Sequence, residues 1–360
     1  MAILDFSKAF DVVPHQRLLI KLDHYGIRGN TKRWIQNFLT DRQQRVVVNG
    51  TPSAWEKVLS GVPQGTVLGP HLFLLFINDI GEGIDSNIRL FADDCLVYRS
   101  IQGPADEMAL QTDLNRLVKW TQTWGMCFNP KKCNIMRITN KRNLSTSKYK
   151  MMGTTLEQTK SSQYLGIHIQ DNLRWKKQSQ HAASKASRAL GFIQRNFHHA
   201  SSKIKEKLVQ TLVRPRLEYG VAAWDPYFTT DINTLERVQR RAARFTVGNY
   251  SREASVTEMM KKLDWDTLEN RRRAHRLTCL YKIHHDELDI SKTYITPKTD
   301  RNRRGQDQQF ELYSTRLKPF RNSFFPRTIK DWNDLPQSLI STDSHDTFKQ
   351  SIPKPKPAQP

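Results

Sequence analysis

The chain has 360 residues, 38% of them hydrophobic, and its 57 lysines and arginines against 35 aspartates and glutamates give a formal net charge of +22. This length and apolar content exclude general disorder and predict roughly two or three folded domains. The longest apolar run, Leu72–Ile77, is too short to span a bilayer, and the cysteines show neither metal-binding nor disulfide spacing. We therefore expect an intracellular protein that does not enter a membrane.

The positive charge is concentrated in the middle of the chain. Residues 1–100 contain 11 basic and 10 acidic side chains, a net charge of +1, whereas residues 171–280 contain 22 and 11, a net charge of +11. A nearly neutral head followed by a cationic body predicts chemistry in the first part and a grip on a phosphate backbone in the second. The alternative is a basic surface that binds nothing.

The first 60 residues predict a strand, two helices and two β-rich runs. Their patterns of apolar residues place them, in this order, at Ala2–Phe6, Gln16–Tyr25, Thr31–Leu39, Arg45–Val48 and Trp55–Leu59. The dipeptide Asn49-Gly50 separates the two β-rich runs, which is typical of a hairpin.

A glycine-containing loop, Ser60–Gly65, then leads into an apolar helix predicted at Leu72–Ile80. Pro70 stands where the first position of that helix is expected. The apolar runs Ile88–Phe91 and Cys95–Tyr98 flank Ala92-Asp93-Asp94, which predicts a tight hairpin with the acids at its tip.

The next segment continues to mix helix and strand. We expect a helix at Glu107–Trp124 and strands at Asn129–Thr139 and Gln163–Ile169. Since there is no regular alternation of strand and helix, residues 1–170 are predicted to be α+β.

Beyond Gln170 the apolar residues step by three and four, which predicts helices. One such stripe is Ile204, Leu208 and Leu212, and another runs from Leu235 to Phe245. On the helix of the second stripe four arginines lie largely off the apolar face and are candidates for nucleic-acid binding: Arg237, Arg240, Arg241 and Arg244. The proline-rich tail, residues 353–360, is predicted to be disordered.

Asp93 and Asp94 are candidates for chemistry because adjacent carboxylates between apolar strands repel each other and need a cation. Mg²⁺ takes oxygen ligands and would need a further acid, for which Asp5 on the first strand is the natural candidate. Two ions held by such acids could activate an attacking hydroxyl and stabilise a leaving oxygen in phosphoryl transfer. The alternative is that Asp93 and Asp94 only form a polar turn. Asp11 is a further acid in this part of the chain, and its alternative is to cap the turn before Pro14.

Taken in order, five segments resemble successive motifs of reverse transcriptases of the non-LTR, LINE-type retrotransposon branch. They are Asp5–Asp11, Gly61–Pro70, Phe91–Asp94, Trp124–Cys133 and Tyr164–Ile167. Phe324–Arg327 and Trp332–Pro336 are in addition similar to the C-terminal end of Jockey-like elements.

The resemblance implies a right-hand polymerase, with an α+β palm of antiparallel sheet and helices at residues 1–170 and an all-α basic thumb at 171–290. A C-terminal region, 291–352, and the tail 353–360 would follow. The implied activity is RNA-directed DNA polymerisation onto a primer 3′-hydroxyl, with two Mg²⁺ ions, or Mn²⁺, as cofactors. RNA template, DNA primer and deoxynucleoside triphosphates are the implied partners, and the nucleus is the implied site of action.

The resemblance also implies a role for individual residues. Asp5, Asp93 and Asp94 would hold the metal ions, and Lys132 would donate a proton to departing pyrophosphate. Phe10 would exclude a ribose 2′-hydroxyl, with ordinary core packing as its alternative, and Lys132 could equally be a solvated lysine. The remaining implied positions are nucleotide-binding Phe6, Pro63, Gln64 and Gly65 and the primer grip Tyr164, Leu165, Gly166 and Ile167.

Only four residues precede Asp5, whereas reverse transcriptases of this branch carry a fingers region and an endonuclease upstream. We therefore expect a fragment that lacks both. Two hypotheses follow: a polymerase, or a catalytically inactive remnant whose basic helices still bind nucleic acid.

Overall fold

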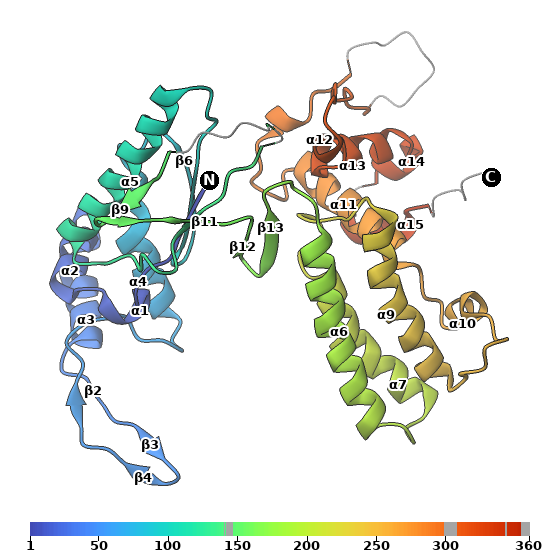
Figure 1. The fold of residues 1–360 in the computed structure, drawn as a ribbon. Coiled ribbons are helices and arrows are strands. Elements are labelled where there is room, and N and C mark those ends of the chain that lie inside the picture. Colours follow the sequence, from blue (N-terminus) through green and yellow to red (C-terminus); the bar gives the residue numbers. More distant parts are fainter. Residues whose placement is uncertain (140, 142–146, 299–307, 343, 354–360) are drawn as a thin grey trace. The chain divides into compact units, whose positions relative to one another are not determined.

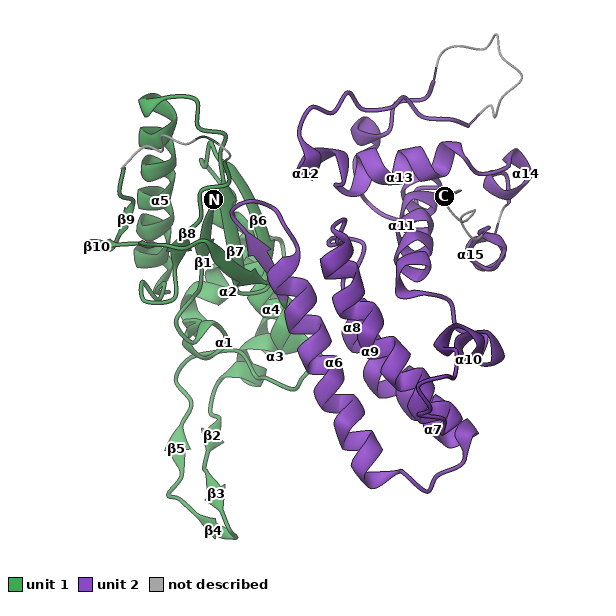
Figure 2. Ribbon diagram, turned by 45° about the vertical axis from the view of Figure 1, so that its right-hand side comes forward, with its two compact units in different colours: residues 1–166 green, residues 167–360 purple. Residues whose placement is uncertain are grey.

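A computed structural model describes residues 1–139, 141, 147–298, 308–342 and 344–353. The chain forms two compact units, residues 1–166 and 167–360 (Figure 2). The predicted boundaries at 170 and 290 stay predictions, and most of the tail predicted to be disordered, residues 354–360, lies outside the described residues. Among the described residues no helix is long and apolar enough to cross a membrane.

A five-stranded sheet in the order β11-β8-β1-β7-β6 organises unit 1. Its strands are β1 (Ala2–Leu4), β6 (Asn87–Phe91), β7 (Asp94–Tyr98), β8 (Asn134–Ile135) and β11 (Glu157–Gln158). The central pairs are antiparallel, and only β8 and β11 are parallel. This mixture with helices confirms the predicted α+β class, although β8 is much shorter than the strand expected at Asn129–Thr139.

The helices of unit 1 lie close to their predicted positions. They are α1 (Ala9–Val12), α2 (His15–His24), α3 (Gly29–Leu39), α4 (Leu68–Ile77), the 3-10 turn η1 (Asn78–Gly81) and α5 (Pro104–Trp124). The helix α5 runs alongside the sheet (Figure 1). Helices and sheet share one hydrophobic core that includes Leu4, Phe73 and Leu114. Pro70 is the third residue of α4 and not the first, because the helix begins at Leu68.

A β-ribbon extends from the body of unit 1 (Figure 1). In it β2 (Gln43–Gln44) pairs with β5 (Glu56–Lys57), and β3 (Val47–Val48) pairs with β4 (Thr51–Pro52). Asn49 and Gly50 form the turn with φ values of 48° and 83°, as a two-residue hairpin turn requires. The predicted hairpin is thus confirmed.

Short strand pairs complete the β-structure. These are β9 (Lys150–Met151) with β10 (Thr154–Thr155), and β12 (Ser161–Tyr164) with β13 (Ile167–Gln170). The single strand expected at Gln163–Ile169 is wrong, because Leu165 and Gly166, with φ values of 47° and 76°, form a turn inside it.

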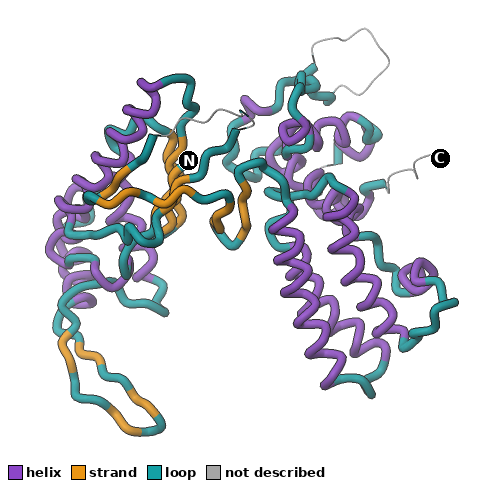
Figure 3. Tube along the Cα trace, in the orientation of Figure 1, coloured by secondary structure: helices purple, strands orange, loops and turns teal. Residues whose placement is uncertain are grey.

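Unit 2 is helical in the described residues apart from β13 and isolated bridge residues (Figure 3). Its longer helices are α6 (Lys176–Asn196), α9 (Thr229–Val247), α11 (Leu268–His284) and α13 (Phe324–Asn333). The shorter ones are α7 (Ser202–Leu208), η2 (Val209–Val213), α8 (Arg214–Glu218), α10 (Val256–Lys262), η3 (Lys292–Tyr294), α12 (Lys318–Arg321), α14 (Gln337–Ile340) and α15 (His345–Ser351).

Two hydrophobic cores hold unit 2 together. Leu190 and Leu235 belong to the first, Trp332 and Phe348 belong to the second, and α11 contributes to both. The stripe expected at Ile204, Leu208 and Leu212 is only partly right. Leu208 packs against the first core, whereas Ile204 and Leu212 are exposed, and the π-helical turn η2 buries Val209 and Val213.

Candidate active site

The pairing of β1 with β7 brings Asp5 to the two adjacent acids. Leu4 pairs with Cys95, so one step further along the antiparallel register Asp5 faces Asp94. Phe91 pairs with Asp94 across a turn of two residues, Ala92 and Asp93. Ala92 adopts a positive φ of 50°, which is costly for a residue with a side chain and is tolerated where the surroundings fix the turn. The predicted hairpin is therefore confirmed, with Asp93 in its turn and Asp94 as the first residue of β7.

The three carboxylates interact electrostatically. Burial raises the pKa of Asp94, and the negative charges of Asp93 and Asp5 raise it further. The Oδ2 atom of Asp5 is buried and accepts no hydrogen bond from any described residue. The Asp5 side chain as a whole is 34% exposed, so the cost of this one buried oxygen is modest, and a nearby cation would offset it.

Lys132 supplies a cation in this structure. Its Nζ atom lies 3.2 Å from Asp5 Oδ2. The Asn129 backbone N–H donates to the Asp5 carbonyl, and the Lys132 N–H donates back to the Asn129 carbonyl. The backbone N–H of Asp5 also points to Cys133 Sγ at 3.4 Å. The turn that carries Lys132 is thus held by hydrogen bonds to Asp5, which is also the residue that forms the ion pair with Lys132.

The donor atoms fit a hard divalent cation, since the carboxylates offer oxygens and Asp5 Oδ2 lacks a hydrogen-bond donor. In the described residues, however, no three His, Cys, Asp or Glu side chains are close enough to hold an ion as they stand. The assignment of Asp5, Asp93 and Asp94 as metal ligands stays a prediction.

The loop before α4 approaches Asp11 rather than the three carboxylates. Gln64 Nε2 donates to Asp11 Oδ1 at 2.9 Å. A Cβ atom at Gly61 would lie 2.7 Å from the Asp11 carbonyl oxygen, so only glycine allows this approach. Gln64 and Gly65 are exposed and Pro63 is buried.

The two phenylalanines implied at the nucleotide differ in their surroundings. Phe10 is half-buried and stacks on Phe73, with ring centroids 4.4 Å apart. Phe6 is only 3% exposed and stacks on Phe128. The side chain of Phe6 therefore lies in the core. Because it is buried there, it does not present its ring to a nucleotide.

The turn between β12 and β13 carries the four residues expected to grip a primer. Tyr164 ends β12, Leu165 and Gly166 form the turn, and Ile167 begins β13. Burial raises the pKa of the Tyr164 phenol, and the charge of Asp94 contributes in the same direction. The first residue of the expected grip thus lies within electrostatic range of the acids.

Three of the four candidate arginines on α9 are exposed: Arg237, Arg240 and Arg241. Arg244 instead donates to the Ser251 carbonyl at 2.7 Å, so its guanidinium is partly committed to the fold.

The sequence analysis overlooked a cationic face on α6. This 21-residue helix contains no Asp or Glu. At 100° per residue its exposed Lys177, Lys185, Arg188 and Arg195 share one face, about 27 Å long, with Phe192 among them. Plotting charges on a helical wheel would have found it.

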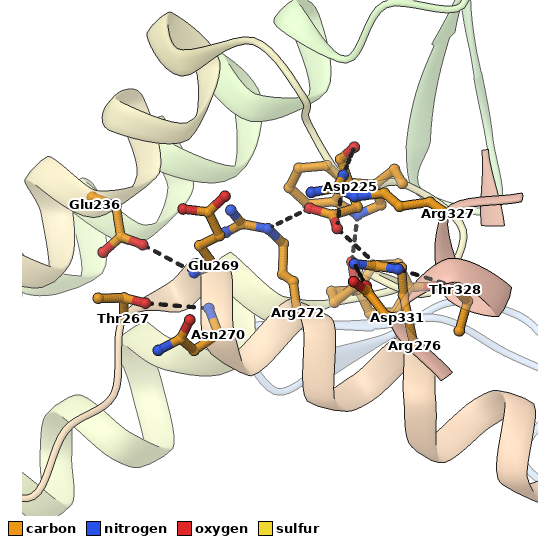
Figure 4. A network of polar contacts seen from close by, with 12 residues as sticks. Asp225, Glu236, Thr267, Glu269, Asn270, Arg272, Arg276, Arg327, Thr328 and Asp331 are labelled. Atoms are coloured by element: carbon orange, nitrogen blue, oxygen red, sulfur yellow. Dashed lines mark hydrogen bonds and ion pairs between the residues drawn. The ribbon is translucent and has the colours of Figure 1, made fainter. Parts of the chain in front are cut away.

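A buried ionic network was also missed. Asp225, in the loop before α9, accepts hydrogen bonds from Arg272 Nε at 2.7 Å and from Arg276 Nε at 2.9 Å (Figure 4). The Nη1 atom of Arg327 forms an ion pair with Asp225 Oδ2 at 3.0 Å. Arg276 also reaches Asp331 at 2.9 Å. The C-terminal segments that contain Arg327 and Trp332 therefore have a structural role. They pack against α11, and Asp331 between them forms an ion pair with Arg276 of that helix.

Comparison with known proteins agrees with this geometry. Residues 1–169 match the family described as "Reverse transcriptase (RNA-dependent DNA polymerase)". The chain is 26% identical over 263 residues to the "Probable RNA-directed DNA polymerase from transposon X-element" of Drosophila melanogaster, covering 68% of this chain and 28% of that protein. The "RNA-directed DNA polymerase from mobile element jockey" of the same species is 27% identical over 256 residues, again covering 68% and 28%.

A more distant relative is the "Retrovirus-related Pol polyprotein from type-1 retrotransposable element R2" of Popillia japonica, 26% identical over 266 residues that cover 67% of this chain and 41% of that protein. The chain spans less than half the length of these relatives. Residues 1–169 nevertheless match the reverse transcriptase family, and 68% of the chain is similar to the polymerases of the X-element and jockey mobile elements.

Proposed function

We propose that this chain forms the palm and thumb of a retrotransposon polymerase that copies RNA into DNA. Unit 1 would be the palm and the first helices of unit 2 the thumb. The observation that carries the proposal is the register of β1 against β7, because it sets Asp5 against the Asp93-Asp94 turn. RNA template, a DNA primer and deoxynucleoside triphosphates are the proposed substrates, with action at nuclear DNA.

In this proposal Asp5, Asp93 and Asp94 hold two divalent ions, Mg²⁺ or Mn²⁺. Bound there, such ions would activate the primer hydroxyl and stabilise the leaving oxygen. Other residues of the chain position the substrate. Gln64 and Gly65 contact the incoming nucleotide, and Phe10 limits the space beside its sugar. Lys132 Nζ carries the proton for the pyrophosphate, and the Tyr164–Ile167 turn holds the primer end.

The cationic faces of unit 2 support a grip on the phosphate backbone. The face of α6, with Lys177, Lys185, Arg188 and Arg195, is free of acids along its helix. The exposed arginines of α9 add to it. Contacts of this kind release counterions, so binding should weaken steeply as salt rises.

Primer extension on an RNA template tests the proposal. The full chain should extend a DNA primer with Mg²⁺ or Mn²⁺, and Asp94→Asn should abolish extension while leaving the affinity for the template–primer duplex unchanged. Extension that survives in Asp94→Asn, or a wild-type chain with no extension, would rule out the polymerase.

A second candidate is an inactive remnant that only binds nucleic acid. The ion pair of Lys132 with Asp5 favours it, because a lysine already neutralises the carboxylate that an ion would need. The remnant predicts salt-sensitive binding of duplex by the wild-type chain without any extension.

A further inference from the structure

A part of unit 1 that lies outside the carboxylate site combines positive charge with exposed aromatic rings. We call residues 28–59, which comprise α3 and the β-ribbon, the ribbon face. It contains six basic residues (Arg28, Lys32, Arg33, Arg42, Arg45 and Lys57) and two acidic ones (Asp41 and Glu56), a net charge of +4. The remainder of residues 1–100 has five basic and eight acidic residues, a net charge of −3. The ribbon face is therefore the positive pole of an otherwise acidic segment.

Two tryptophans of the ribbon face are open to solvent. Trp34 on α3 is 60% exposed and stacks on Phe38, with ring centroids 5.8 Å apart and planes within 13°. Trp55 is 57% exposed and lies under the Arg45 guanidinium, 4.6 Å from the ring centroid. Single exposed apolar residues are common, whereas exposed apolar side chains gathered on one element mark an interaction surface.

The β-pairing explains why Arg45 and Trp55 meet. Gln44 pairs with Glu56, and the next residues along the antiparallel register are Arg45 and Trp55. The ribbon thus presents a cation and an aromatic ring as a fixed pair. Lys57, two residues after Trp55, pairs with Gln43 at the base of the same strands, so the ribbon carries a second positive charge.

The tip of the ribbon adds apolar surface. Val46, Val47 and Val48 are all more than half exposed. Apolar and aromatic surface interleaved with Arg and Lys suits nucleobases and phosphates together, because every base has a π-face and every link has a negative charge. A purely apolar protein partner would not complement the net charge of +4 on the ribbon face.

We propose that the ribbon face binds single-stranded RNA, with bases stacked on Trp34 and Trp55 and phosphates on Arg42, Arg45 and Lys57. This site goes beyond the proposed polymerase function, and it does not depend on the carboxylates of that function.

Binding of a fluorescent 12-nucleotide oligouridine to the full chain, followed by anisotropy, tests this. Trp55→Ala should weaken binding roughly tenfold, since base stacking on an aromatic ring contributes about 1–3 kcal/mol. Arg45→Gln should lower the slope of log affinity against log salt by roughly 0.7, the value per phosphate contact of a single strand. The matched controls on α5, Met108→Ala for an exposed apolar side chain and Lys119→Gln for an exposed cation, should bind as the wild type does.

A second measurement locates the contact. With 4-thiouridine in the oligonucleotide, photo-crosslinking followed by tryptic digestion should place an adduct on peptide 46–57, which Arg45 and Lys57 delimit. Unchanged affinity of Trp55→Ala and Arg45→Gln, or crosslinks confined to other peptides, would overturn the proposal. Self-association of the chain that Trp55→Ala abolishes and salt does not affect would also overturn it, by showing a protein contact. Asp94→Asn should leave oligouridine binding unchanged, so loss of polymerase activity and loss of this site can be told apart.

Discussion

Lys132 Nζ lies 3.2 Å from Asp5 Oδ2, an oxygen that is buried and receives no hydrogen bond from any described residue. The ammonium group therefore stands where the carboxylate would meet a divalent ion. Because the Lys132 side chain is two-thirds exposed, the pair adds at most about 1 kcal/mol to folding stability. Its main consequence is competition with a cation for Asp5.

Lys132→Met should strengthen Mn²⁺ binding by roughly three- to tenfold, since about 1 kcal/mol of competing attraction is removed. Electron paramagnetic resonance of free Mn²⁺ measures this without any need for catalysis. Lys131→Met, which removes the neighbouring exposed lysine, is the control and should leave the affinity as in the wild type. Equal affinities in the two variants would contradict competition by Lys132.

Phe10→Ala distinguishes a sugar gate from core packing. A gate needs a large ring beside the 2′ position, and specificity is a difference in transition-state binding, so the variant should use ribonucleotides more readily relative to deoxyribonucleotides in primer extension. The stacking of Phe10 on Phe73 also predicts lost stability, up to roughly 3–5 kcal/mol for a fully buried ring and less for this half-buried one. A lower melting temperature with an unchanged sugar preference would assign Phe10 to the core alone.

Asp225→Asn should destabilise unit 2 by about 3–5 kcal/mol, because the buried Arg272 would lose its counter-charge and Arg276 would keep only Asp331. Urea unfolding followed by circular dichroism measures the change. Asp286→Asn, which breaks the exposed pair with Lys292, is the control and should cost less than about 1 kcal/mol. Similar losses in the two variants would mean that the buried network contributes no more than a surface ion pair.

The pair His168 and His181 should make unit 2 less stable in acid. The rings lie 4.6 Å apart, and His168 Nδ1 and His181 Nε2 accept no hydrogen bond among the described residues. Burial lowers the pKa of both, and the charges of Lys177, Lys185 and, for His181, Arg188 lower it further. The folded state thus disfavours the proton that an unfolded histidine takes up near pH 6.5.

Since the unfolded state binds more protons below that pH, stability is retained above about pH 6.5 and is lost as the pH falls toward the lowered folded values. Melting temperatures measured from pH 7.5 to pH 5 check this. The double substitution His168→Gln, His181→Gln should flatten part of the slope, whereas His198→Gln, His199→Gln, which changes two exposed residues that follow α6, should not. A slope that is unaffected by the first pair of substitutions would refute the assignment.

Local patterns in the sequence determined much of this protein. The approximate positions of α2 and α5, the helical character of α9, the Asn49-Gly50 hairpin and the hairpin with Asp93 at its tip follow from apolar periodicity and turn chemistry, which act over a few residues. The order of the motifs was also sufficient to recognise the family, because motif order is a property of the chain and not of its packing.

Only the tertiary structure decided the contacts between distant residues. Lys132 meets Asp5 from 127 positions away, Asp225 collects arginines from α11 and α13, and Phe6 turns into the core although its neighbour Asp5 faces the acids. These relationships depend on how whole surfaces pack against each other, and the free energy of such packing is summed over many residues that are far apart in the sequence. No local window carries that sum, which is why the sequence pointed to the three acids and to Lys132 but not to the ion pair between Lys132 and Asp5.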